Sequence, residues 1–146
     1  MQRISRKKHA IIWWLVSIVW LSLTVYLSSQ IGSESANLSR TIAEFSWNLL
    51  SKFLSKLGFA RYHFYVRKLA HFFVHAVLAF TVYRASNYSF KRKGAVVAFT
   101  LILVTSVAVF DEIIQLQAPG RVSTSMDAGI NLLGVCIGTC LSSILP

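Results

Sequence analysis

Acidic side chains are scarce in this chain of 146 residues. Five Asp and Glu stand against 15 Lys and Arg, which gives a formal net charge of +10, and 55% of the residues are hydrophobic. A nucleic-acid-binding domain carries its basic residues on one face of a soluble core, and this chain is too apolar for that arrangement. We therefore expect no nucleic-acid partner and interpret the basic residues as flanks of membrane-spanning segments.

Motifs that would identify an enzyme class are also missing. The chain has no nucleotide-binding loop, no Cys-x-x-Cys zinc motif and no Gly-x-Ser-x-Gly elbow, and we expect no cofactor. Cys136 and Cys140 lie four residues apart in an apolar run, where helix geometry disfavours a disulfide, and we interpret them as small packing residues. The sequence shows no internal repeat and no soluble domain, so residues 1–146 are predicted to form a single membrane domain.

Long apolar runs are abundant instead. Together with their flanks, four of them approach the length of about 20 residues that a membrane span needs. The predicted spans are residues 10–28, 68–84, 94–115 and 127–145. The predicted fold class is therefore all-α, an integral membrane four-helix bundle.

The basic residues predict the orientation of these spans. The segments before the first span and between the second and third are short, rich in Lys and Arg and almost free of acid. On the other side, most basic residues lie in a long connection that also holds Glu34 and Glu44. Short basic segments stay in the cytoplasm, so we predict that both termini are cytoplasmic. The first run is longer than the apolar part of a secretory signal and is interpreted as a retained anchor.

The long connection between the first and second spans has a helical pattern. Its apolar side chains recur at spacings of three or four, and its polar side chains recur on another face. The apolar positions are Leu38, Ile42, Phe45, Leu49, Phe53 and Leu57. We predict an extracytoplasmic amphipathic helix, which either lies in the outer membrane interface or packs on the other helices as a lid.

Polar residues of three predicted spans fall at one depth in the membrane. At a rise of about 1.5 Å per residue, His71 lies one turn inside the second span and Asn131 one turn inside the fourth. Asp111 and Glu112 lie near the outer end of the third. Ionisable groups within a span usually face the bundle interior or a cavity, so we expect these residues to converge. Adjacent helical residues point about 100° apart, so only one of the two acids is expected to point inward.

These residues belong to an ordered pattern that resembles a known family. The pattern reads Arg67-Lys68-x-x-His71-Phe72, Asp111-Glu112-x-x-Gln115, Pro119-Gly120-Arg121, Asp127, Asn131 and Gly134. It resembles the signature of the VanZ-like membrane proteins, a family named for a teicoplanin-resistance protein, and Ser28-Ser29-Gln30 resembles that family's opening. The resemblance runs from about residue 26 to the end. It implies a small protein of the bacterial plasma membrane, linked in some members to glycopeptide tolerance, and it supplies no reaction.

The polar cluster has two interpretations. As a binding site, it would hold an anionic head group of a membrane lipid or a lipid-linked cell-wall precursor at the outer leaflet. If the protein is an enzyme, it would also chemically modify this head group. The predicted binding residues are Arg67, Lys68, Gln115, Arg121, Asp127 and Asn131, and the predicted catalytic residues are His71, Asp111 and Glu112. In the alternative, the cluster is purely structural: the acids would pair with basic residues, and Asp127 would cap its helix. The protein would then be a non-catalytic membrane scaffold or envelope stress factor. Arg121 is expected at the rim, where a charge contributes little to folding.

Two further pairs leave alternatives open. His71 and His75 are four residues apart and could chelate a metal together with an acid. Because position 75 is usually aromatic in the family that the chain resembles, we predict no metal site. We interpret His75 as a packed polar residue in place of an aromatic side chain. Gly134 and Gly138 allow another helix to approach closely. Packing within the bundle is favoured, and a homo-oligomer through these glycines is the alternative.

Overall fold

The computed structural model describes residues 2–54, 56–121 and 124–145, and all regular structure within these ranges is helical. The helices are α1 (Gln2–Ser29), α2 (Gly32–Leu50), α3 (Phe59–Ser89), α4 (Lys93–Gln117) and α5 (Ser125–Ile144). Four of them, all except α2, are long and apolar enough to span a membrane. The predicted all-α membrane fold is confirmed, and α1, α3 and α4 extend beyond their apolar runs.

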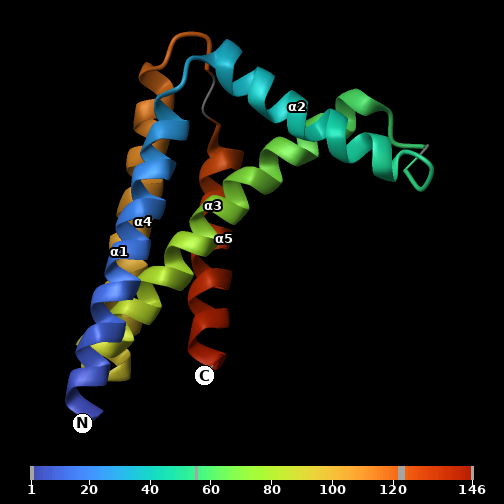
Figure 1. Ribbon diagram of the computed structural model, residues 1–146. Helices are drawn as coiled ribbons and strands as arrows, with labels where there is room; N and C mark the ends of the chain where they lie inside the picture. Colours follow the sequence, from blue (N-terminus) through green and yellow to red (C-terminus); the bar gives the residue numbers. More distant parts are fainter. Residues whose placement is uncertain (1, 55, 122–123, 146) are drawn as a thin grey trace.

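The spanning helices form a bundle that α3 crosses diagonally (Figure 1). Helix α3 contacts every other helix, whereas α1 packs on α3 and α4. Both termini lie at one end of the bundle, and the α1–α2 and α4–α5 connections lie at the other. A helix satisfies its backbone hydrogen bonds internally, which is why apolar segments in lipid adopt this architecture.

Helix α2 extends sideways from the bundle and packs against the first turns of α3 (Figure 1). Ala43 is fully buried in this contact, and the Tyr62 hydroxyl donates a hydrogen bond of 2.8 Å to the Ser46 hydroxyl. The ring of Trp47 contacts the rings of Phe59 and Tyr62. The large apolar side chains of α2 remain exposed, namely Leu38, Ile42, Phe45 and Leu49. Helix α2 therefore packs on α3 through one face and presents an apolar face outward.

The helical pattern that the sequence predicts as far as Leu57 is wrong beyond Leu50. The backbone N–H groups of Phe53 and Leu54 bond to the Leu50 carbonyl in a turn, and Phe53 is 86% exposed. The chain must reverse here because α3 begins at Phe59 and runs back along α2. The apolar spacing in the sequence therefore continues past the end of the helix.

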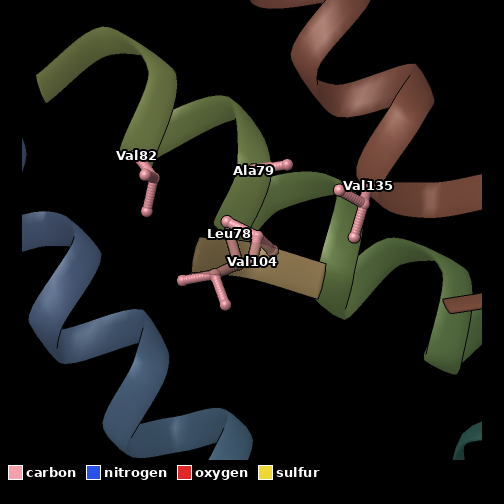
Figure 2. Packing of buried hydrophobic residues seen from close by; sticks show 5 residues of the cluster. All are labelled: Leu78, Ala79, Val82, Val104 and Val135. Atoms are coloured by element: carbon pink, nitrogen blue, oxygen red, sulfur yellow. The ribbon is translucent and has the colours of Figure 1, made fainter. Parts of the chain in front are cut away.

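The apolar core lies where α3, α4 and α5 meet (Figure 2). Leu78, Ala79 and Val82 of α3 pack against Val104 of α4 and Val135 of α5. Lipid tails are as apolar as these side chains, so close packing rather than transfer out of water stabilises such a core.

Glycines bring α5 against α3. A Cβ atom at Gly134 would lie 2.4 Å from the Phe72 carbonyl oxygen, and one at Gly138 would lie 2.0 Å from the Ala76 carbonyl oxygen. Packing of this face within the bundle is thus confirmed. A homo-oligomer through the same glycines stays a prediction, and it would have to form at a face that α3 of the same chain covers.

The two cysteines lie on a different face of α5. Cys136 and Cys140 are exposed free thiols, which confirms the absence of a disulfide between them. Their interpretation as packing residues is wrong, because α3 contacts the glycine face of α5.

The two connections opposite the termini pack on each other. The Gly32 N–H donates a hydrogen bond of 2.9 Å to the Pro119 carbonyl, and a Cβ atom at Gly32 would lie 2.1 Å from the Gly120 carbonyl oxygen. Gly120 has a φ of 73°, in the left-handed region that favours glycine. This turn follows α4 in the chain and packs on the start of α2, next to the polar cluster.

Candidate functional site

Asp111 and Glu112 near the end of α4 are both buried, with 5% and 9% of their surface exposed. Ser28 of α1 donates a hydrogen bond to Oδ1 of Asp111, and Gln115 Nε2 donates to its Oδ2 at 2.7 Å. Asn131 Nδ2 of α5 donates to Oε1 of Glu112 at 2.7 Å. The prediction that only one acid points inward is therefore wrong. Helix α4 has α1 and α5 as separate neighbours, so two directions about 100° apart both meet protein.

His71 of α3 lies beside these carboxylates. One ring nitrogen of His71 and one oxygen of each acid lie within 4.8 Å of one another. The expected convergence of polar residues from three helices is confirmed. No hydrogen bond of the His71 ring is found within the described ranges of the chain.

His75 lies one turn further along α3 and is almost fully buried. Its Nδ1 donates a hydrogen bond of 3.1 Å to the backbone carbonyl of His71, and its Nε2 is buried without a partner among the described residues. The cluster of neighbouring ligand atoms includes His71 and both acids but not His75. The two histidines therefore do not form a chelating pair, and His75 is packed, as predicted.

Arg121 fastens the α4–α5 connection to α1. Its Nη1 donates hydrogen bonds of 2.9 Å to the backbone carbonyls of Leu27 and Ser28. These carbonyls belong to the last turn of α1, where backbone acceptors lack partners within the helix. Burial lowers the pKa of the Arg121 guanidinium, and the carboxylate of Asp111 opposes this shift. Arg121 is thus bonded to the end of α1 and is not a free charge at the rim, and its small contribution to folding stays a prediction.

Lys68 and Asp127 form an ion pair between α3 and α5. Lys68 Nζ lies 2.5 Å from Oδ1 of Asp127, and the side chains are 17% and 7% exposed. Thr124, not Asp127, is the cap of α5: its hydroxyl accepts a hydrogen bond from the Asp127 N–H and donates one to Oδ2. Asp127 instead lies in the first turn of the helix, where a carboxylate is favoured by the helix dipole.

A cavity of about 380 Å³ adjoins the polar cluster. Its walls are mostly apolar side chains of α1, α2 and α3, and its polar lining includes Arg67, His71, Asp111, Gln115 and Arg121. Arg67 is exposed and makes no hydrogen bond or ion pair with any described residue. Of the predicted binding residues, Lys68, Asp127 and Asn131 are not among the lining residues that the structure describes.

The VanZ/LLP1 family model matches residues 13–146. The chain belongs to this family. The match includes most of α1, which holds the first span, and so begins before residue 26, where the resemblance in the sequence starts. Comparison with curated proteins and comparison with solved structures gave no match.

Helix α1 of this VanZ/LLP1 protein supplies site residues that the sequence analysis missed. Ser28 bonds to Asp111, and Thr24 and Ser28 line the cavity together with Gln30, which directly follows the helix. Oε1 of Gln30 is buried without a hydrogen-bond partner in the described part of the chain. The available signal was the spacing of Thr24 and Ser28, two small polar residues four apart at the outer end of an uncharged run.

Proposed function

We propose that this VanZ/LLP1 protein binds the anionic head group of a membrane lipid or lipid-linked cell-wall precursor in the outer leaflet of the bacterial plasma membrane. The observation that carries the proposal is the cavity of about 380 Å³, which joins apolar walls to a basic side chain without a protein partner among the described residues. An amphiphile with an apolar chain and an anionic head group matches both parts.

The apolar walls of the cavity suit a lipid chain. Leu38 and Ile42 of α2 and Leu69 and Phe73 of α3 line the cavity, and all are exposed. Exposed apolar side chains of a membrane protein face lipid, so a lipid chain can enter the cavity from the side without first crossing water.

Arg67 is the residue best placed to hold the head group. A guanidinium binds phosphate through paired, charge-assisted hydrogen bonds, and that of Arg67 is available. Arg121 adds positive charge to the same cavity while its Nη1 remains on the carbonyls of α1. Gln115 also lines the cavity, but its Nε2 is already bonded to Asp111.

The outer-leaflet location depends on the orientation of the chain. The α1–α2 and α4–α5 connections, which contribute Gln30 and Arg121 to the cavity, lie at one end of the bundle. Both termini lie at the other end. The short basic segments at the terminal end support a cytoplasmic location for the termini. A bound cell-wall precursor would also link the protein to teicoplanin tolerance, as the resemblance implies.

Lipid binding can be tested with the purified full chain in phosphatidylcholine nanodiscs. The probe is a polyprenyl phosphate, the control ligand is the uncharged polyprenol of equal length, and binding is measured by native mass spectrometry. We expect Arg67→Gln to weaken phosphate binding by about tenfold or more, since a hydrogen bond to a charged group contributes roughly 1.5–3 kcal/mol.

The matched control is Arg61→Gln, an exposed arginine six residues earlier on α3 that is absent from the lining of the cavity. It should leave binding unchanged. Equal binding of phosphate and alcohol by the natural sequence would show that the cavity does not recognise an anionic head group.

A second candidate function is that of a non-catalytic scaffold. The observation in its favour is that protein groups supply the hydrogen bonds to Asp111 and occupy Nη1 of Arg121. In that case Arg67→Gln would leave any cellular phenotype intact, and only variants that lose folded protein would lose it. The catalytic roles predicted for His71, Asp111 and Glu112 stay predictions, since neither function requires them.

A further inference from the structure

We propose that His71, Asp111 and Glu112 form a binding site for a divalent transition-metal ion, with Oδ1 of Asn131 as an additional oxygen donor. The first three residues each direct one ligand atom to a common region, and these atoms lie within 4.8 Å of one another. The proposal is independent of lipid binding, because it uses neither Arg67 nor the apolar walls of the cavity.

The charge of the cluster favours a cation. Asp111 and Glu112 are buried neighbours within a membrane-spanning helix, where ionised carboxylates are costly unless compensated. The donors to Asp111 are the neutral side chains of Ser28 and Gln115. Arg121 is the nearby cation, but its Nη1 is bonded to the backbone carbonyls of α1, and it forms no ion pair with Asp111 in the described part of the chain. A divalent cation would balance the two carboxylates within one site.

Asn131 supplies an independent observation. Its side chain is fully buried, and its Nδ2 donates to Oε1 of Glu112 at 2.7 Å. Its Oδ1 is also buried but has no hydrogen-bond partner in the described part of the chain. Rotating the amide would place this oxygen against a carboxylate oxygen, so the Nδ2 contact fixes which way the amide faces. A buried acceptor without a donor is unfavourable, and a metal ion would satisfy it.

The donor set indicates the class of metal. One imidazole with two carboxylates suits ions such as Zn²⁺ and Mn²⁺, whereas Ca²⁺ and Mg²⁺ prefer oxygen ligands alone. Bonds of about 2.0–2.2 Å place the ligands of a tetrahedral ion roughly 3.3 Å apart, so the side chains must close from their present separations. His71 and Asp111 also line the cavity, which gives an ion a route to the site.

The site can be tested with the full chain, purified through a histidine-free tag in phosphatidylcholine nanodiscs and treated with a chelator. Zn²⁺ or Mn²⁺ is then added in increasing amounts, and free metal is removed by gel filtration. The metal that stays bound is measured by inductively coupled plasma mass spectrometry. We expect one ion per chain. His71→Gln and Glu112→Gln should each weaken binding by at least about 100-fold, because loss of an outer-shell partner alone costs 10–100-fold.

The matched control is His63→Gln, which removes a histidine of the same helix that contacts Ser39 outside the cluster. It should bind metal like the natural sequence. Binding that survives both ligand substitutions, or that His63→Gln abolishes, would overturn the proposal.

A measurement on the natural sequence removes any dependence on variants that fail to fold. Pulsed electron paramagnetic resonance of bound Mn²⁺ should show coupling to one imidazole nitrogen, which His71 supplies. Absence of stoichiometric metal, or bound Mn²⁺ without this coupling, also overturns the site. Because the nanodiscs contain no anionic lipid, either result leaves the lipid proposal to its own test with Arg67.

Discussion

Arg67 and Lys68 are neighbours on α3, yet Lys68 is paired with Asp127 at 2.5 Å whereas Arg67 lines the cavity without a partner among the described residues. Successive helical residues point about 100° apart, so one side chain meets α5 and the other meets the cavity. Two adjacent basic residues therefore have separable effects on folding and on binding.

Lys68→Gln should reduce the stability of the folded protein by up to about 3–5 kcal/mol, because it leaves the buried carboxylate of Asp127 without its cation. Arg67→Gln, the matched control, should change stability by no more than about 0.5 kcal/mol. Thermal unfolding in detergent provides the comparison. The double variant Lys68→Gln with Asp127→Asn should recover much of the loss, since it removes both charges; failure to recover would show that the pair is not the cause.

Arg121→Ala should lower stability by about 1.5–3 kcal/mol, because charge-assisted hydrogen bonds to the Leu27 and Ser28 carbonyls are lost. Arg121→Lys should retain part of the stability, since an ammonium can reach one acceptor but lacks the planar fork. The measurement is the fraction of folded protein against temperature. An unchanged Arg121→Ala protein would support the rim charge that the sequence analysis expected.

Gly138→Ala should destabilise the bundle by about 1–3 kcal/mol or more, since the new Cβ would lie 2.0 Å from the Ala76 carbonyl oxygen and force α5 away from α3. Gly129→Ala is the control on the same helix, because a Cβ there meets no atom within 4 Å. That change should be neutral or stabilising by up to about 1 kcal/mol. Comparable unfolding temperatures for the two variants would contradict the close contact.

The orientation can be tested by cysteine labelling in a variant with Cys136 and Cys140 replaced by alanine. A cysteine in place of the exposed Ser33, at the start of α2, should react with an impermeant thiol reagent added to intact cells. A cysteine in place of the exposed Lys91, between α3 and α4, should react only after lysis. The reverse pattern would move the cavity to the cytoplasmic leaflet.

Much of the fold follows from the sequence. Apolar runs of sufficient length predict membrane helices because no other backbone conformation with internal hydrogen bonds fits a single segment in lipid. The even number of spans places both termini at one end. The depth of His71, Asn131 and the two acids is also predictable, because the rise per residue of a helix is nearly constant.

The length of α2 shows where pattern reasoning stops. The spacing of Phe53 and Leu57 continues the apolar face beyond Leu50, yet the chain leaves the helix there. A periodic pattern describes which residues would share a face, but the helix ends where the chain reverses to begin α3.

The sequence alone thus determined the helical membrane fold, the membership of His71, Asn131 and the two acids in one polar layer, and the close approach of the glycine face. The tertiary structure decided which groups meet within that layer: Asp111 with Ser28, Lys68 with Asp127, and Arg121 with the end of α1. Depth depends on the position of a residue along its own helix. Partner choice depends on the rotation of each helix about its axis and on the diagonal course of α3, which arise only when all the helices pack together.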